Sequence, residues 1–315
     1  MRKYPRTLPE FEADFATEAA CREYLFRLRW PEGFRCPHCG HSTAWRIGEV
    51  LWQCPKCHNR TSLTAGTVFE NTRKPLALWF RAMWLVTSQK NGVSALGLQK
   101  VLGLGSYETA WTWLHKLRRA MVRPGRDRLS GVIEVDETYW GGPEEGVRGR
   151  ETFKKVLIVV AAQEDGKAVG RIRLRHVADA SSASLLPFIE DSIEPGSLVK
   201  TDGWKGYNGL GGKGYRRQII VVSQRRESAS DLLPGVHRVV SLLKRWLMGT
   251  HQGAVSSEHL DYYLDEFTFR FNRRTSRHRG MLFYRLAQQA LALETVLYKD
   301  MVTHCRGPKP QGYKM

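Results

Sequence analysis

Apolar residues recur at helical spacing from Pro75 to about Met121. The pattern falls into separate runs, and Gly103 and Gly105 stand between the last run and the one before it. Ser106 precedes the last run, where its side chain can accept a hydrogen bond from the first turn of a helix. The pattern predicts three helices with a short glycine-containing turn, which is the outline of a helix-turn-helix unit. Any other amphipathic unit of three helices would give a similar pattern.

Beyond a polar linker at about 123–130, the pattern changes to short segments rich in Val, Ile and Leu, which are typical of strands. These segments cover 131–139, 155–162, 170–177, 197–201 and 215–222. Helical patterns cover 182–193, 237–250, 257–271 and 282–298. Three strands before the first of these helices, followed by strands and helices in alternation, predict an α/β fold with a mixed sheet flanked by helices.

We therefore expect four segments along the chain. They are an N-terminal region at 1–67, a helical unit at 68–125, an α/β domain at 126–300 and a tail at 301–315. The tail after Cys305 is polar and contains proline and glycine, so we expect it to be frayed.

The charge of the chain changes this picture from a fold to a class of partner. The 315 residues carry 49 Lys and Arg against 31 Asp and Glu, which gives a formal net charge of +18. Such a positive field attracts polyanions, so nucleic acid is the expected partner, with an anionic membrane surface as the alternative. The longest apolar run, Val156 to Ala162, is far shorter than the roughly 20 residues that span a bilayer. Acidic residues near the N-terminus do not fit an export signal, and we expect a cytoplasmic protein.

Two Cys-x-x-Cys pairs, Cys36 with Cys39 and Cys54 with Cys57, are separated by fourteen residues. Each pair can place two thiolates on one side of a tight turn, and two such turns complete the tetrahedral sulfur shell that zinc prefers. Disulfides are the alternative, but a reducing compartment disfavours them, and a redox Cys-x-x-Cys would not be expected to occur twice. We expect a structural zinc ribbon at about 33–62, with a short β-hairpin between the pairs.

Two aspartates follow short apolar strand patterns and precede glycine-rich turns. Asp136 lies in the segment 131–142, which ends in Gly-Gly, and Asp202 lies in 197–207 before Gly203. Carboxylates at strand ends of one sheet can share divalent cations, although a single aspartate is more often a turn former or a helix cap. Glu134 lies two residues before Asp136 on the same strand face and is a further, weaker candidate.

Four motifs in this order resemble the ISXO-type insertion-sequence transposases, a branch of the acidic-triad transposases. The motifs lie at 136–142, 201–207, 242–251 and 263–274. The order of zinc ribbon, helical unit and catalytic domain also matches, so the resemblance covers nearly the whole chain.

The resemblance implies a ribonuclease-H-like fold in which two Asp and a third polar residue hold catalytic Mg²⁺ or Mn²⁺. Asp136 and Asp202 match the first two places, and the third place, 35 positions after Asp202, holds His237. Most acidic-triad enzymes have Glu in this place and relatives in this branch often have Asn, so His237 is a departure. Because Mg²⁺ prefers oxygen ligands and Mn²⁺ tolerates nitrogen better, His237 is either a third ligand or a group that orients water. Alternatively, it caps or packs the helix that begins there.

Lys244 lies two helical turns after His237 and shares its face, so we expect it to reach a DNA phosphate; an ordinary surface lysine is the alternative. Basic residues elsewhere are expected to contact DNA, although solvated helix surfaces would look similar. These residues are Lys116, Arg118, Arg119, Arg245, Arg270, Arg273 and Arg274.

The resemblance thus implies a transposase that cleaves DNA at the ends of its element and transfers the 3′-hydroxyl into target DNA. The expected partners are the terminal inverted repeats, target DNA and further copies of the chain in a dimer or higher multimer. We expect a bacterial protein that associates with the nucleoid when it is bound. The alternatives are a non-catalytic zinc-ribbon DNA-binding protein, such as a domesticated transposase, and a structure-specific nuclease.

Overall fold

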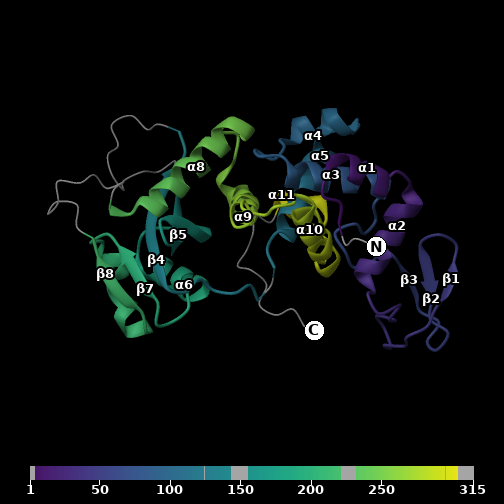
Figure 1. The fold of residues 1–315 in the computed structure, drawn as a ribbon, viewed down its shortest axis with the longest axis horizontal. Coiled ribbons are helices and arrows are strands. Elements are labelled where there is room, and N and C mark those ends of the chain that lie inside the picture. The colour runs from purple at the N-terminus through teal and green to yellow at the C-terminus, as the bar shows by residue number, and fades with distance from the viewer. Residues whose placement is uncertain (1–3, 124, 143–154, 221–231, 295, 304–315) are drawn as a thin grey trace. The chain divides into compact units, whose positions relative to one another are not determined.

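The computed structural model describes residues 4–123, 125–142, 155–220, 232–294 and 296–303, which form two compact units (Figure 1). The first unit holds the described residues up to Arg123 together with those from Thr275 onward, and the second unit holds those in between. The structure therefore ends the α/β unit at Arg274, whereas the predicted domain extends to residue 300. The expected frayed tail after Cys305 lies outside the described residues.

The first unit combines a small sheet with helices from both parts of the chain. Its helices are α1 (Leu8–Asp14), α2 (Glu18–Arg29), α3 (Leu76–Ser88), α4 (Ala95–Leu102), α5 (Tyr107–Ala120), α10 (Gly280–Ala292) and α11 (Tyr298–Thr303). Its strands β1 (Trp45–Ile47), β2 (Leu51–Gln53) and β3 (Arg60–Ser62) pair antiparallel in the order β1-β2-β3. The hairpin β1-β2 was expected, and β3 adds a third strand.

Aromatic packing explains why the C-terminal helices belong to the first unit. Phe283 of α10 is fully buried, and its ring packs against those of Phe11, Phe15, Phe80 and Trp84 at centroid distances of 5.4, 5.5, 5.6 and 6.1 Å. The apolar pattern of this helix predicts that it packs against something, but the pattern does not show which partner.

The three predicted helices of the helix-turn-helix outline are α3, α4 and α5. Gly103 ends α4 in the left-handed conformation, with φ of 62°, where a side chain would be strained. Ser106 begins α5, and its hydroxyl accepts a hydrogen bond of 3.1 Å from the N–H of Thr109, as predicted.

The second unit contains a mixed sheet of five strands in the order β6-β5-β4-β7-β8. The strands are β4 (Val132–Trp140), β5 (Val156–Asp165), β6 (Ala168–Val177), β7 (Leu198–Thr201) and β8 (Arg216–Ile219). β4, β5 and β6 pair antiparallel, and β7 and β8 run parallel to β4. The predicted strands are confirmed to within a few residues, except at 221 and 222, which are not described.

Helices cover both faces of this sheet (Figure 1). One face packs against α8 (Pro234–His251) and α9 (Leu260–Phe271), which the short 3₁₀ helix η3 (Ser257–His259) precedes. The other face packs against α6 (Ser182–Ser192) and the 3₁₀ helix η1 (Lys205–Lys213). This architecture confirms the predicted α/β fold and is consistent with a ribonuclease-H-like domain.

α8 begins at Pro234, three residues before the predicted start. His237 therefore lies in the first turn of the helix and does not begin it. Among the described residues, no helix has the length and apolar character that a membrane span requires.

Candidate functional site

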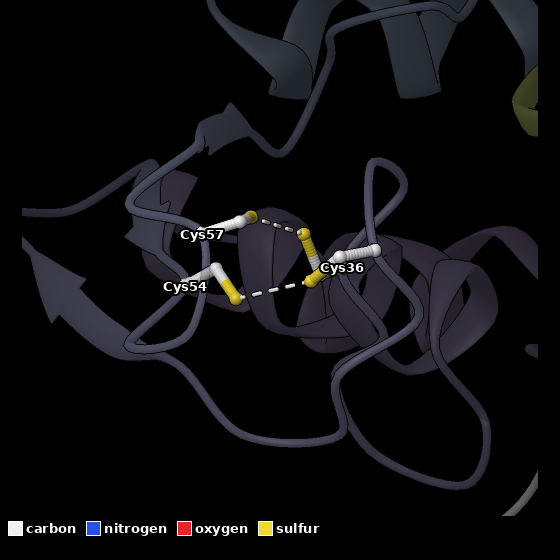
Figure 2. A group of neighbouring side chains, drawn as sticks. Cys36, Cys54 and Cys57 are labelled. Carbon is white, nitrogen blue, oxygen red and sulfur yellow. Dashed lines mark hydrogen bonds between the residues drawn. The ribbon is translucent and has the colours of Figure 1, made fainter.

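The four paired cysteines of the first unit come together at the base of the small sheet. Their sulfur atoms lie within 4.8 Å of one another, with Cys36 Sγ 3.6 Å from Cys57 Sγ and Cys39 Sγ 3.6 Å from Cys54 Sγ (Figure 2). A disulfide needs about 2.05 Å, so these thiols are not bonded to each other. Four sulfurs around a zinc ion at about 2.3 Å would be separated by roughly 3.8 Å, so the cluster fits a tetrahedral zinc site.

The two cysteine turns have the same backbone hydrogen bonds. The N–H of Gly40 donates to Cys36 O at 2.9 Å, and the N–H of His58 donates to Cys54 O at 3.0 Å. Both residues have positive φ, 73° for Gly40 and 56° for His58. Because this conformation costs a residue with a side chain about 1–2 kcal/mol, His58 is held there by the turn that the metal site requires.

The turns also prepare the thiols to bind a cation. Burial by itself disfavours a thiolate at Cys54, but backbone N–H groups of Cys57 and Lys56 point at its sulfur and lower its pKa to about 7. The same balance, with N–H groups of Cys39 and His38, lowers the pKa of Cys36. Burial and hydrogen bonds with the other three cysteines raise the pKa of the Cys57 thiol, so the thiols differ from one another. The predicted zinc ribbon is therefore supported by the donor set and its spacing.

Asp136 lies in β4, and Asp202 directly follows β7, the strand that runs parallel to β4. The register pairs Glu134 of β4 with Lys200 of β7, and each aspartate lies two residues beyond this pair. Side chains two residues apart share a face of a sheet, and adjacent strands lie about 4.8 Å apart. Both residues therefore lie just beyond the paired stretch of β4 and β7, at the same end of it.

His237 of α8 reaches the same place. Its Nε2 lies 4.0 Å from Asp136 Oδ2, and the side chains of His237 and Asp136 are 34% and 21% exposed. Burial lowers the pKa of His237, which favours the neutral imidazole. Within the described residues, the cysteine cluster is the one tight group of three or more possible ligand residues.

Two residues that the sequence did not single out hold Asp202 in place. The backbone N–H of Trp204 donates to Asp202 Oδ1 at 3.0 Å. Arg217 of β8 donates to the carbonyl oxygens of Asp202 and Trp204, both at 3.0 Å, and to Thr201 Oγ1 at 3.0 Å. The motif around Asp202 contains Trp204, whereas no local pattern shows that Arg217, from the adjacent strand, clamps this turn.

Positive side chains gather on α8 beyond His237. Lys244 is half-buried, and both its burial and the nearby charge of Lys155 lower its pKa. Arg245 is exposed, as is Arg238, which lies seven residues earlier on the same helix face. Arg238 was not predicted, and its spacing from Arg245 is the signal that identifies it.

The expected DNA contacts of α5 need a correction. The side chain of Arg118 is 1% exposed, so it belongs to the interior of the first unit and does not face DNA. Lys116 is half-buried, and burial lowers its pKa. Arg119 is half-buried too, and its DNA contact stays a prediction. The prediction grouped three basic residues that lie within four positions, but neighbouring residues point to different sides of a helix.

The basic end of α9 also has internal roles. The side chain of Arg270 is 11% exposed and lies 3.3 Å from fully buried Glu266, so the expected phosphate contact of Arg270 is corrected to an ion pair within the unit. The guanidinium of Arg273 lies 4.0 Å from the centre of the Phe269 ring. Arg274 donates to the carbonyls of Val169, Gly170 and Phe271, and DNA contact by Arg273 or Arg274 stays a prediction.

Residues 128–272 match the family described as ISXO2-like transposase domain, and residues 16–60 match the family described as transposase zinc-ribbon domain. A relative from Halobacterium salinarum, "Uncharacterized protein in transposable element ISH50", is 26% identical over 278 residues, which are 81% of this chain and 91% of the relative. An "Uncharacterized transposase-like protein" from Haemophilus influenzae is 29% identical over 96 residues, which are 30% of this chain and 76% of the relative. The two matched domains together span more than half of the chain, and both imply interaction with DNA.

Proposed function

We propose that this chain, which belongs to the ISXO2-like transposases with an N-terminal zinc ribbon, cuts DNA at the ends of its own insertion sequence and joins the freed 3′-hydroxyl to target DNA. The observation that carries the proposal is that Asp136 and Asp202 each lie two residues beyond the paired stretch of β4 and β7, with His237 of α8 4.0 Å from Asp136. Both aspartate side chains are partly exposed.

Asp136 and Asp202 would hold divalent cations, Mg²⁺ or Mn²⁺, through carboxylate oxygens. Such ions neutralise the charge that develops on a phosphodiester during in-line displacement and activate the attacking oxygen. Trp204 and Arg217 keep the Asp202 turn in place, so the carboxylate does not have to be ordered when DNA arrives.

His237 and Lys244 complete the site from one face of α8. A neutral imidazole can ligate a metal through Nε2 or orient a water molecule, and nitrogen suits Mn²⁺ better than Mg²⁺. Lys244 and Lys155 bring positive charge together, which favours a phosphate at this point. Arg238, Arg245 and the exposed basic residues of the ribbon extend the proposed contact with DNA. The ribbon residues are Arg35, His38, Arg46, Lys56, His58 and Arg60.

Cleavage of an end-labelled duplex that carries the inverted repeats flanking the coding sequence tests the proposal. Wild-type protein should nick the duplex in Mn²⁺ and in Mg²⁺, and Asp136→Asn or Asp202→Asn should abolish nicking while the protein still binds the duplex. Asp191→Asn is the matched control, because this exposed carboxylate pairs with Arg175 away from the site and should leave cleavage unchanged. Nicking by Asp136→Asn would exclude this assignment.

One observation favours a second candidate, a non-catalytic zinc-ribbon DNA-binding protein. His237 stands where an acidic residue would supply a further negative charge for the cations. If wild-type protein shifts the duplex but nicks it in neither metal, this candidate is correct. Products of strand transfer, as distinct from hydrolysis alone, would separate a transposase from a structure-specific nuclease.

We also propose that the protein acts as a dimer or higher multimer on DNA in the bacterial cytoplasm, where it associates with the nucleoid. Joining two element ends requires both ends to be held at once, and sedimentation of the protein with the inverted-repeat duplex measures how many copies bind.

A further inference from the structure

The first turn of α8 cannot cap itself. Leu233 occupies the N-cap position and its side chain makes no capping hydrogen bond. Pro234 lacks an N–H, and the N–H groups of Gly235 and Val236 have no acceptor within the helix. Serine, threonine, aspartate or asparagine usually supplies that acceptor at the N-cap, so this helix start depends on a group from elsewhere.

Glu134 of β4 supplies the missing acceptor. The N–H of Val236 donates to Glu134 Oε2 at 2.8 Å, and the N–H of Gly235 is also directed at this carboxylate. The side chain is buried, at 4% exposure for the residue. A carboxylate at this end of a helix also interacts favourably with the helix dipole.

Gly235 leaves the room that this contact needs. A Cβ atom at Gly235 would lie 2.9 Å from Glu134 Oε2, closer than real Cβ atoms approach, and 3.2 Å from its Cδ, so the Glu134 side chain would have to move. The glycine has no positive φ, so the close approach of the carboxylate explains it and backbone strain does not. The Pro-Gly pair thus removes one donor and opens the helix end to a carboxylate from the sheet.

This contact connects the two sides of the proposed active site. Glu134 lies two residues before Asp136 on the same strand face, and Val236 directly precedes His237. A shift or rotation at the start of α8 would therefore change the distance between His237 and Asp136 directly.

We propose that Glu134 is a positioning residue that fixes the first turn of α8 and thereby holds His237 beside Asp136. The inference rests on the proposed function, since it assigns Glu134 a role in that same site. Glu134 acts through the helix and is not a catalytic residue. It follows that the position of His237 relative to Asp136 depends on both Glu134 and Gly235, although 101 positions separate Glu134 from Gly235 in the sequence.

The chain contains a matched control for a purely structural cap. Glu18 of α2 accepts hydrogen bonds from the N–H groups of Leu76 and Ala77, at 2.8 and 3.1 Å, at the start of α3. Pro75 is the N-cap residue there and cannot cap, as with Leu233. Glu18→Ala should lower the melting temperature of the protein without changing its affinity for Mn²⁺ at the proposed site.

The experiment uses the full-length, zinc-loaded protein and measures Mn²⁺ binding by the electron paramagnetic resonance of free Mn²⁺, together with cleavage of the inverted-repeat duplex. Glu134→Ala should weaken Mn²⁺ binding and slow cleavage by about 10- to 100-fold each, the range found when outer groups that orient metal ligands are removed. Affinity for the duplex should stay unchanged, and the Val236 amide should lose protection from hydrogen exchange.

Gly235→Ala should act in the same direction as Glu134→Ala, because the added methyl group displaces the carboxylate. In the double variant, the methyl group meets no carboxylate, so the second substitution should add no further loss. Gly249→Ala is the control on the same helix, since nothing lies within 4 Å of a Cβ there, and it should leave Mn²⁺ binding unchanged.

Glu134→Gln keeps an oxygen that can accept the hydrogen bond from the N–H of Val236, so this variant should retain most of the Mn²⁺ affinity. It also tests the inference if Glu134→Ala does not fold. Equal losses for the Gln and Ala variants would overturn the hydrogen-bond argument. Unchanged Mn²⁺ affinity in both Glu134→Ala and Gly235→Ala would overturn the inference, even if Asp136→Asn abolishes binding and cleavage as the proposed function requires. If Asp136→Asn keeps both, the proposed function itself fails.

Discussion

Replacing Phe283 by alanine tests whether the C-terminal helix α10 is part of the first unit. The ring is fully buried among the aromatic rings of α1, α3 and the segment that follows α1. Removing a buried Phe side chain usually costs about 3–5 kcal/mol, through lost transfer free energy and the cavity that remains. The tightly packed rings around it cannot easily collapse, so we expect a value in the upper half of this range.

Hydrogen exchange followed by peptide mass spectrometry measures this loss in each unit separately. Since about 1.4 kcal/mol corresponds to a tenfold change, the slowest amides of α3 should lose roughly three to four orders of magnitude of protection. Amides of β4 and β5 in the second unit should keep their protection. Leu297→Ala is the control, because Leu297 lies in the same C-terminal segment and is 45% exposed.

Loss of protection in β4 and β5, with α3 unchanged, would refute the reasoning. It would mean that α10 stabilises the α/β unit, as the predicted domain boundary at residue 300 assumed. A loss smaller than about 1 kcal/mol in both units would show that the aromatic cluster is not packed as described.

Four further predictions follow from single groups. Cys36→Ser should release zinc and unfold the ribbon, because the binding energy of a structural zinc, roughly 10 kcal/mol or more, is also folding energy. A zinc-sensitive dye measures the released zinc and circular dichroism measures the unfolding. A ribbon that stays folded would contradict the assignment. Burial raises the pKa of Cys21 to about 12, so only about one Cys21 thiol in 10,000 is ionised at pH 8. Iodoacetamide should therefore not modify Cys21 in the native protein. Rapid alkylation would show that the thiol is accessible. Arg118→Ala should lower the stability of the protein, whereas Arg245→Ala should weaken DNA binding and reduce the slope of log affinity against log salt concentration by about one. Thermal melting measures the first effect, and filter binding at several salt concentrations measures the second. The reverse pattern would restore Arg118 as a DNA contact. His237→Glu should shift the metal preference of cleavage from Mn²⁺ toward Mg²⁺, and an unchanged ratio of the two rates would mean that His237 does not face the cations.

Local chemistry made the zinc ribbon and the strands predictable. A Cys-x-x-Cys pair forms a turn by itself, and two pairs at this spacing need little else to define a tetrahedral donor set. The Val-rich segments around Asp136 and Asp202 identified their strands, because alternation and β-branched residues report on the backbone directly. Membership of the transposase family is confirmed by the matched domains, whereas the catalytic assignments of Asp136, Asp202, His237 and Lys244 stay predictions.

Errors arose where burial, which the packing of the whole unit decides, sets the role of a residue. Arg118 looked like a DNA contact because the pattern places it on a basic helix end, but the packing of the first unit buries it. Arg270 looked like another, but Glu266 one turn earlier is buried and pairs with it. The pattern of α10 was that of a helix with a buried face, and it contained nothing to say that the face packs against residues near the N-terminus.

The sequence by itself determined the elements, the cysteine site and the two strand ends that carry aspartates, since each depends on neighbours within a few positions. Only the tertiary structure decided that Glu134 of β4 is in register with Lys200 of β7, that Arg217 donates to the backbone carbonyl of Asp202, and that Glu134 caps the first turn of α8. These contacts join residues that are distant along the chain, and no periodicity can record a hydrogen bond between a strand and a helix about a hundred residues apart.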